Sequence, residues 1–486
     1  MNNLKIKKIC CVGAGYVGGP SMAVIADRCP DLNIFVVDSN LQRVDAWNND
    51  DLSKLPIYEP GLDQVVSRTR NRNLFFSNNI DESIKKADMV FISVNTPIKE
   101  KGIGAGETSD LRWVESCARQ ISEVSEGHTI VVEKSTLPVR TAEVIKLILD
   151  EVVNMKDGSS NKKTFDVLSN PEFLAEGTAI KDLLYPDRVL IGGDNQNAIN
   201  ELSDIYLNWV PNEKILQTNI WSSELAKLTA NAFLAQRISS INSIAAICEA
   251  TGADVREVSR AIGTDTRIGS KFLDSGPGFG GSCFKKDILN LVYLAEYFGL
   301  PEVATFWNEV VKLNTWHQHR ISKLIIKKLF GNLSSKKIAV LGFSFKSNTN
   351  DTRESASIQI CKDLLDEGAS LFIQDPKVDP KQIERDLDLP MQSSDLENNN
   401  LISSDGSWSF SSEIEDTFIN ADAILILTEW QEYEKINWLK MSQKVRKPCW
   451  VFDARSIIDP EKVINSGLNF WRVGDGVIKD LYKEDN

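Results

Sequence analysis

The spacing of short apolar runs along the chain predicts its architecture. Within the first 219 residues such runs lie at 8–12, 34–37, 74–77, 89–94, 129–133, 165–168 and 188–191, separated largely by helix-compatible segments. Apolar strands that alternate with helices are typical of a parallel sheet with helices on both faces. The pattern therefore predicts an α/β fold with a mostly parallel, doubly wound sheet.

A second series of the same kind begins after Leu333. Apolar runs at 337–341, 371–374, 423–427 and 450–452 predict strands, with a helix that ends near Glu367. The stretch 392–409 is rich in Ser, Asn and Asp, which predicts a surface loop. We therefore expect two Rossmann-like doubly wound parallel-sheet domains in one chain.

Between these series lies a segment without a strand pattern. Residues 221–250 contain no proline, so they predict one long helix, which Ser222 or Ser223 can cap and Gly252 can end. This helix is apolar on most of its circumference from Leu225 to Ile247, so we expect it to be largely buried. The predicted domains are 1–219, a central helical domain at 220–330, and 331–486.

A glycine motif follows the first predicted strand. It reads Gly13-Ala14-Gly15-Tyr16-Val17-Gly18 and precedes a helix-compatible segment, while Asp38 follows the second strand, 20 residues past Gly18. Strand, glycine turn, helix, strand and acid in this order form the dinucleotide-binding fingerprint. An acid at this place binds the adenine ribose hydroxyls and repels a 2′-phosphate, which favours NAD over NADP.

A second glycine-rich segment carries reactive residues. Four of the six residues from Gly276 to Gly281 are glycine, and the apolar period at 288–298 predicts that Cys283 lies beside the first turn of a helix. Free N–H groups and the helix dipole favour a thiolate there. Asp287, four residues on, shares its helix face. A structural turn with a buried cysteine is the alternative, but the combination favours covalent chemistry on a phosphorylated ligand.

Two polar residues interrupt the apolar surface of the long central helix. Lys227 and Asn231 are four residues apart, so they face the same way into a dry environment. A buried lysine is costly unless it meets an anion. A structural salt bridge is the alternative, and we favour a functional role.

Composition narrows the classes of function. The net charge of −13, without a basic block, argues against a nucleic-acid partner, and there is no apolar run of about 18 residues that would predict a membrane span. Eight scattered cysteines without Cys-x-x-Cys spacing or a signal peptide predict reduced thiols and a cytoplasmic location. Three histidines leave little for a zinc site, so we expect no metal and expect the base to be Lys, Asp or Glu.

Several motifs occur together in one order. After the fingerprint come Asn95-Thr96-Pro97, Asn170-Pro171-Glu172-Phe173, the Lys227/Asn231 helix, the loop to Cys283, and Gly342-Phe343-Ser344-Phe345-Lys346. From about Lys7 to Gly474 the chain resembles the UDP-glucose 6-dehydrogenases, the eukaryotic-type branch of the UDP-glucose/GDP-mannose dehydrogenase family. The resemblance implies NAD as cofactor and the twofold oxidation of UDP-glucose to UDP-glucuronate through a Cys283 thiohemiacetal and thioester.

The resemblance also implies roles for individual residues. Lys227 and Asn231 would stabilise an oxyanion, Asp287 would support the water or the alcohol proton, and Glu172 would act on the hydrolytic water. The implied catalytic residues are Cys283, Lys227, Asn231, Asp287, Glu172 and Thr136. The implied cofactor-binding residues are Gly13, Ala14, Gly15, Tyr16, Val17, Gly18, Asp38, Arg43, Val94, Asn95, Thr96, Pro97, Ser135, Thr136, Glu176 and Arg353. The implied substrate-binding residues are Glu172, Phe173, Leu174, Lys227, Asn231, Arg267, Phe272, Phe279, Gly280, Phe345, Lys346 and Arg455.

Other functions remain open at this stage. A sister enzyme could act on GDP-mannose or UDP-N-acetylmannosamine with the same chemistry, although the run 237–242 favours glucose by analogy. A single-step hydroxyacid dehydrogenase would not need Cys283, and a non-catalytic binder would not need Lys227, Asn231 and Cys283 together. The long apolar helix predicts a homo-oligomer, a dimer or a hexamer built of dimers, in which the family's counterpart of Arg267 reaches the neighbouring subunit's site. The segment 154–163 is predicted to be surface variation.

Overall fold

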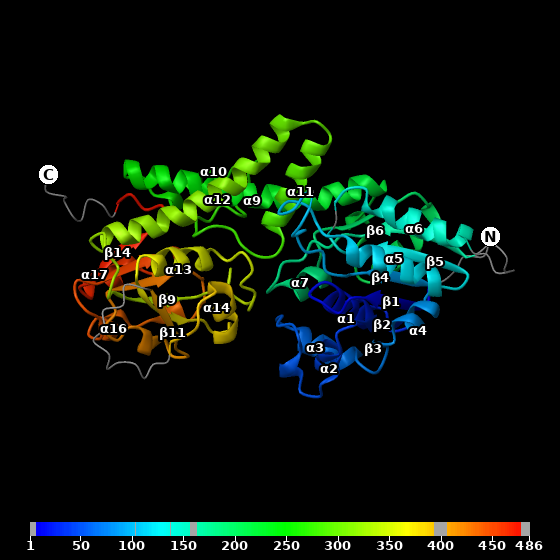
Figure 1. Ribbon diagram of the computed structural model, residues 1–486, viewed down its shortest axis with the longest axis horizontal. Coiled ribbons are helices and arrows are strands. Elements are labelled where there is room, and N and C mark those ends of the chain that lie inside the picture. The colour runs from blue at the N-terminus through cyan, green and yellow to red at the C-terminus, as the bar shows by residue number, and fades with distance from the viewer. Residues whose placement is uncertain (1–5, 103, 137, 156–162, 393–405, 478–486) are drawn as a thin grey trace. The chain divides into compact units, whose positions relative to one another are not determined.

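The computed structural model describes residues 6–102, 104–136, 138–155, 163–392 and 406–477 (Figure 1). The chain forms two compact units. The first unit comprises Met1–Ala230 and Leu289–Leu300, and the second comprises Asn231–Ile288 and Pro301–Asn486. The division into domains at 219/220 and 330/331 stays a prediction, and most of the segment 154–163 lies outside the described residues.

The first unit is built on one large sheet. In the described part of the chain its strand order is β3-β2-β1-β4-β5-β6-β7-β8, and every neighbouring pair is parallel except β6 with β7. The first six strands have the order of a dinucleotide-binding fold. All seven predicted strands are present, and β8 was not predicted. The strands are β1 Lys8–Val12, β2 Asn33–Val37, β3 Leu74–Ser77, β4 Met89–Ile92, β5 His128–Glu133, β6 Thr164–Ser169, β7 Val189–Gly193 and β8 Ile215–Thr218.

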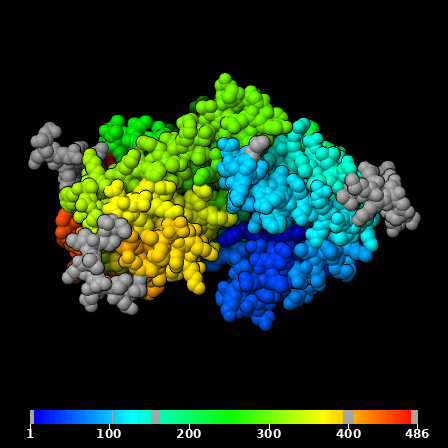
Figure 2. Space-filling model, viewed as in Figure 1, coloured from blue at the N-terminus to red at the C-terminus, as the bar shows by residue number. Residues whose placement is uncertain are grey.

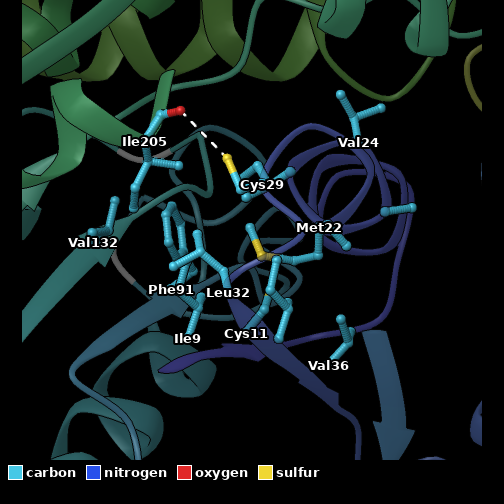
Figure 3. Packing of buried hydrophobic residues seen from close by; sticks show 14 of the residues in the cluster. Ile9, Cys11, Met22, Val24, Cys29, Leu32, Val36, Phe91, Val132 and Ile205 are labelled. Atoms are coloured by element: carbon cyan, nitrogen blue, oxygen red, sulfur yellow. Dashed lines mark hydrogen bonds between the residues drawn. The ribbon is translucent and has the colours of Figure 1, made fainter. Parts of the chain in front are cut away.

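Helices cover both faces of this sheet. Along β1, Ile9 and Cys11 belong to one hydrophobic core and Cys10 and Val12 to the other, because successive strand residues point to opposite faces. In Figure 3, Cys11 packs near Met22. Both cysteines of this strand, Cys10 and Cys11, are fully buried. The helices are α1 Gly18–Arg28, α2 Leu41–Asn48, α3 Leu62–Thr69, α4 Ile80–Lys85, α5 Arg112–Val124, α6 Thr141–Met155, α7 Ala179–Leu184 and α8 Gln196–Tyr206, with short 3₁₀ turns at Leu52–Lys54 and Asn212–Lys214.

The second unit contains a smaller sheet in which every pair is parallel. Its strand order among the described residues is β11-β10-β9-β12-β13-β14, again a doubly wound order. The four predicted strands are present. The strands are β9 Lys337–Leu341, β10 Ser370–Gln374, β11 Ser407–Phe410, β12 Ala423–Ile426, β13 Trp450–Asp453 and β14 Asn469–Arg472, and the helices are α13 Ala356–Asp366, α14 Pro380–Leu387, α15 Ile414–Thr417, α16 Trp438–Met441 and α17 Pro460–Asn465, with a 3₁₀ turn at Tyr433–Lys435.

The predicted surface loop at 392–409 is wrong at its end. Residues from Ser407 form β11, which pairs with β10 from Ser370↔Ser407 to Ile373↔Phe410. Trp408 at the centre of this strand is buried and donates its indole N–H to Leu389 O at 2.9 Å. Residues 393–405 lie outside the described part of the chain.

The long central helix is confirmed as α9, Ile220–Thr251, but its predicted cap is wrong. The Asn219 side chain accepts the Ser222 N–H at 2.8 Å, whereas the Ser223 hydroxyl bonds Ser169 instead. Gly252 ends the helix as predicted, with φ +83° and its N–H on Cys248 O at 3.0 Å. The remaining helices of this region are α10 Val255–Gly263, α11 Phe284–Tyr297 and α12 Pro301–Lys328.

The prediction that α9 is largely buried holds for only part of its surface. Leu228, Ala232, Ala235 and Ile241 are buried, but Phe233 is 55% exposed. Further exposed apolar side chains on α9 and α12 are Trp221, Leu225, Ile247, Val303, Phe306 and Trp316. The yellow-green region that includes α12 lies at the surface in Figure 2. Among the described helices, none is long and apolar enough to cross a membrane.

Candidate active site

The predicted glycine turn joins β1 to α1. Gly13 has φ +109°, and a Cβ built on it would lie 2.1 Å from Ser93 O, so only glycine fits. A Cβ on Gly18 would lie 2.0 Å from Gly13 O, because the helix start packs tightly on the turn. A Cβ on Gly15 would meet open space. Gly13 and Gly18 thus serve the fold, while Gly15 leaves room for a ligand to approach the backbone.

Asp38 lies directly after β2, beside this turn. The carboxylate accepts the Ala14 N–H at 3.0 Å, the Asn40 N–H at 2.9 Å and the Arg43 guanidinium at 2.9 Å. Burial opposes the charged form, but these hydrogen bonds outweigh it and lower the pKa of Asp38. The group is therefore a fixed anion at the place where the fold binds an adenine ribose.

The carboxyl ends of β4 and β5 are hydrogen-bonded to each other. Ser135 Oγ donates to Val94 O at 2.8 Å, and Thr96 Oγ1 donates to Thr136 O at 3.2 Å. Asn95 and Pro97 next to them are exposed. The predicted cofactor-binding residues of these two segments thus lie together at the carboxyl ends of neighbouring strands, where ligands of doubly wound folds bind.

A buried polar cluster lies beside that edge. Lys227 Nζ is 3.2 Å from Glu172 Oε1, and the Thr136 hydroxyl donates to the same oxygen at 3.3 Å. Both charged side chains are almost fully buried, at 5% exposure for Lys227 and 6% for Glu172. The other carboxylate oxygen accepts the Leu174 N–H at 3.2 Å. The structure therefore brings together three of the predicted catalytic residues and supplies the anion that a buried lysine requires.

The segment after Glu172 is held from two sides. The Phe173 ring lies 3.8 Å from the Arg188 guanidinium and 5.4 Å from Lys227 Nζ. Glu59 is buried and accepts the Gly177 N–H at 2.7 Å and the Ala179 N–H at 3.1 Å, on either side of the start of α7. Neither Glu59 nor Arg188 was predicted, because nothing near them in the sequence marks their distant partners.

In the second unit, Cys283 immediately precedes α11, as predicted. Its carbonyl accepts the Asp287 N–H at 2.9 Å, and its Sγ lies 3.4 Å from Ser282 Oγ. All eight cysteines are in the described part of the chain; seven are buried, and Cys283 alone is partly exposed. The alternative of a buried structural cysteine therefore does not apply to this residue.

Asp287 is fully buried and connects α11 to α9. Its Oδ2 accepts the Asn231 side-chain N–H at 2.6 Å. Lys227 and Asn231 occupy successive turns of α9, so one helix presents both residues. The pairing of Asn231 with Asp287 could not be predicted, since the two are 56 positions apart.

The glycines before Cys283 approach protein atoms closely. A Cβ on Gly280 would lie 2.5 Å from Glu354 O, and one on Gly281 would lie 3.1 Å from the Phe345 ring. Gly281 N–H also donates to Arg353 O at 2.8 Å. The loop therefore packs on the turn after β9.

Asp375 follows β10 and contacts the turn after β9, but its carboxylate oxygens are already occupied. Asp375 Oδ2 accepts the Phe343 and Ser344 N–H groups at 2.8 and 3.0 Å, and also the Ser344 hydroxyl and the Trp430 indole. Its Oδ1 accepts two further backbone N–H groups. A carboxylate with this many donors has little capacity left for a ribose diol.

Cationic side chains surround the same turn. Arg455 Nε donates to Leu427 O and its guanidinium donates to Phe345 O, both at 2.7 Å, while Lys346 Nζ lies 5.5 Å from the Phe345 ring. Arg353 pairs with Asp351 at 2.6 Å. These predicted residues lie around one turn, where Arg353 and Arg455 already pair with the carboxylates of Asp351 and Glu429.

The remaining predicted residues lie in varied surroundings. Arg267 is 88% exposed and pairs with Asp265 at 2.6 Å. Phe272 is 39% exposed with φ +62°, whereas Phe279 is 5% exposed. Glu176 is partly buried in the first unit, as are Tyr16 and Val17.

Fold and site define a dinucleotide-dependent oxidoreductase with one cofactor turn, a buried lysine–glutamate pair and an accessible cysteine. Models of the UDP-glucose/GDP-mannose dehydrogenase family match the chain at 7–210 (NAD binding domain), 221–316 (central domain) and 339–460 (UDP binding domain). The chain belongs to this family.

Individual relatives agree with the family models. The chain is 55% identical to UDP-glucose 6-dehydrogenase of Gallus gallus, over 94% of this chain and 90% of the relative. It is 53% identical to UDP-glucose 6-dehydrogenase of Drosophila melanogaster, over 96% of both. The structure of a UDP-glucose dehydrogenase from Pyrobaculum islandicum superposes with a TM-score of 0.80 at 27% identity, covering 98% of this chain and 99% of that one.

Proposed function

We propose that the protein oxidises UDP-glucose to UDP-glucuronate in two steps, with two NAD⁺ and one water consumed. The observation that carries the substrate is the similarity to relatives named UDP-glucose 6-dehydrogenase over at least 94% of this chain. The alternative is the same chemistry on another nucleotide sugar, GDP-mannose or UDP-N-acetylmannosamine.

The residues of the first unit fit NAD. The open space at Gly15 and the fixed anion at Asp38 would hold the pyrophosphate and the adenine ribose, with the backbone at Ala14, Tyr16, Val17 and Gly18 around them. Val94, Asn95, Thr96, Pro97, Ser135 and Glu176 would lie along the rest of the cofactor. When bound, NAD⁺ supplies the hydride acceptor for each oxidation.

Cys283 is the proposed nucleophile for the second oxidation. Its thiolate adds to the aldehyde carbon, which forms a C–S bond and leaves an oxyanion on the former carbonyl oxygen, and this oxygen takes a proton from Lys227 to give the thiohemiacetal. Oxidation of this thiohemiacetal gives a thioester, and water then cleaves the C–S bond to give the carboxylate and the free thiol. Partial exposure and the N–H groups at the start of α11 support this role.

The buried polar residues are proposed to move protons and stabilise charge. Lys227 and Asn231 would stabilise the oxyanion, and Lys227 would assist proton transfer. Glu172, which pairs with Lys227, would accept a proton from the hydrolytic water. Thr136 would orient Glu172 through their hydrogen bond, and Asp287 would fix the Asn231 amide.

Residues of the second unit are proposed to hold the nucleotide sugar. Lys346 and Arg455 would bind the diphosphate, and Phe279, Gly280 and Phe345 would line the sugar and base. Phe173, Leu174 and Phe272 would complete the substrate contacts. The exposed Arg267 would act in the site of a neighbouring subunit, and Arg353 would lie near the nicotinamide.

The protein is also proposed to be a cytoplasmic homo-oligomer. Phe233 and Ile247 on α9 and Phe306 on α12 are each more than half exposed, which is unfavourable unless another surface covers them. A second copy of the chain would bury them in a dimer, and dimers could form a hexamer. Gel filtration that shows only a 54.3 kDa species would contradict this proposal.

The decisive experiment compares nucleotide sugars. Purified protein is incubated with NAD⁺ and UDP-glucose, GDP-mannose or UDP-N-acetylmannosamine, and both NADH and the uronate are measured. We expect two NADH per UDP-glucuronate and at most a slow reaction with the other two sugars. Faster turnover of either competitor would replace the proposed substrate by that sugar.

A further inference from the structure

The loop that precedes Cys283 is held by side chains of two helices. Asn242 on α9 accepts the Gly276 N–H at 3.0 Å, and His317 on α12 bonds Gly276 O through Nε2 at 2.9 Å. Asn314 on α12 accepts the Phe279 N–H at 2.9 Å and donates to Phe279 O at 3.1 Å. Asn242 and His317 are at most 1% exposed, and Asn314 is 7% exposed.

These contacts provide hydrogen-bond partners for buried backbone groups, which would otherwise destabilise the fold. The loop from Gly276 to Phe279 is buried but belongs to no helix or strand, so its N–H and C=O groups need partners outside regular structure. The Asn314 amide bonds both the N–H and the C=O of Phe279, as the backbone of a neighbouring strand would. Because glycine gives the loop wide conformational freedom, such contacts select one conformation from many.

The chemistry of His317 suits a positional role. The Gly276 carbonyl can only accept, so Nε2 carries the proton and the ring is neutral. Burial, with the nearby Arg320 charge, lowers the pKa of His317 to about 3, although its bond to Gly276 favours the charged form. His317 Nδ1 is buried, and the described part of the chain offers it no hydrogen-bond partner. The ring therefore holds the loop as a neutral donor and is unsuited to acid–base chemistry near neutral pH.

We call Asn314 and His317, with their bonds to Gly276 and Phe279, the clamp. Between the clamp and Cys283 the loop makes further close contacts. Gly280 and Gly281 pack on Glu354 O and the Phe345 ring. The clamp thus determines where the chain enters the last four residues before the start of α11.

We propose that Asn314 and His317 are positioning residues for Cys283, acting through the backbone of Gly276 and Phe279. The assignment rests on the proposed nucleophilic role of Cys283. It goes beyond that role, because it assigns part of the reactivity of the thiol to two side chains of α12 that make none of the proposed substrate or cofactor contacts.

The test uses the full-length protein with Asn314→Leu, the milder Asn314→Ser, His317→Leu and His317→Gln. Glutamine can place an amide N–H near the position of His Nε2, so His317→Gln should restore what His317→Leu loses. Ser239→Ala is the matched control: its hydroxyl links the same two helices by donating to Val310 O at 3.1 Å, but does not touch the loop.

Alkylation by iodoacetamide reports directly on Cys283. The other cysteines are buried, and burial raises the pKa of Cys117 and of Cys449 to about 12, which slows their reaction. Labelling of the Cys283 peptide is followed by mass spectrometry, together with kcat, KM for NAD⁺ and the melting temperature.

We expect Asn314→Leu, Asn314→Ser and His317→Leu to change the labelling rate of Cys283 and to lower kcat by about tenfold or more, with KM for NAD⁺ within about twofold of wild type. His317→Gln and Ser239→Ala should stay near wild type. If the Leu and Ser variants melt earlier but keep the wild-type labelling rate and kcat, the residues are merely structural and the proposal is wrong.

A failure of the proposed nucleophilic role of Cys283 would give a different result from a failure of the positioning role. If Cys283→Ala still formed UDP-glucuronate, the nucleophile role would be lost, while the labelling arm would still report whether the clamp positions the thiol. If His317→Gln behaved like His317→Leu, the donor role of His317 would be refuted even with Cys283 essential.

Discussion

Replacing Lys227 by methionine separates the structural and catalytic roles of the buried polar cluster. The change keeps most of the side-chain volume but removes the cation 3.2 Å from Glu172. The carboxylate would keep the Thr136 hydroxyl and the Leu174 N–H, both at more than 3 Å, but would lose its charge partner in a site only 6% exposed.

The two roles predict effects of different size on different quantities. Removing one partner of a buried ion pair costs about 3 kcal/mol of folding stability, because an uncompensated charge stays buried. Loss of an oxyanion-stabilising group lowers kcat by about 10²-fold while substrate affinity changes far less. The double variant Lys227→Met/Glu172→Gln removes both charges, so it should recover most of the stability and none of the activity.

The assay pairs urea unfolding with steady-state kinetics for the wild type, both single variants and the double variant. The assignment is supported if Lys227→Met lowers kcat while substrate affinity changes little, and if the double variant recovers the lost stability. If the double variant regained activity, Lys227 would serve only to neutralise Glu172. If Lys227→Met lost UDP-glucose binding as much as kcat, the lysine would be a ligand clamp.

Four further outcomes are expected. Asp38→Ala should raise KM for NAD⁺ and narrow the preference over NADP⁺, and equal use of both cofactors by the wild type would refute the assignment. Cys283→Ala should form no UDP-glucuronate but still reduce supplied UDP-6-aldehydo-glucose with NADH, as product analysis would show. Gly15→Ala should weaken NAD⁺ binding with little change in melting temperature, whereas Gly18→Ala, which clashes with backbone, should lower the melting temperature. Burial raises the pKa of Glu133 well above its usual range, and the neighbouring Glu224 adds to this effect, so the folded state keeps a proton that the unfolded state loses as the pH rises above about 4.3. Stability should therefore fall as the pH rises above that value, and Glu133→Gln should reduce that fall in thermal unfolding.

Some features of the fold were predictable because their causes are local. The strand β1, the glycine turn and Asp38 lie within 31 consecutive positions, from Lys8 to Asp38, so the motif that defines the cofactor turn is complete in the sequence. The end of α9 at Gly252 also follows from one residue that adopts positive φ easily.

The strands that were missed share a position in their sheets. Among the described strands, β8, β11 and β14 lie at the edges of their sheets, with one hydrogen-bonded neighbour each. An edge strand needs no continuous apolar run, since it is covered less completely than a central strand. In β8 the four side chains are half-buried or exposed, so its sequence differs little from that of a loop.

Helix α9 shows the same limit in another form. Its apolar circumference predicted burial, but sequence periodicity does not say whether the chain itself or another molecule covers a given face. Phe233 and Leu228 are both apolar positions of one helix, yet the first is 55% exposed and the second is fully buried. The capping of α9 by Asn219 was missed because Ser223 has a distant partner, Ser169, that no local pattern reveals.

By itself the sequence determined the two doubly wound sheets, the cofactor turn, the long helix and the reactive types of residue at Lys227, Asn231 and Cys283. These depend on periodicity, glycine geometry and motif spacing, all of which act over a few neighbouring positions. Only the tertiary structure decided that Lys227 meets Glu172, that Asn231 holds Asp287, and that Asn314 and His317 clamp the cysteine loop. Those partners are 35 to 56 positions apart, and what joins them is the packing of separate helices and strand ends, which brings buried polar groups to the one partner that satisfies each of them.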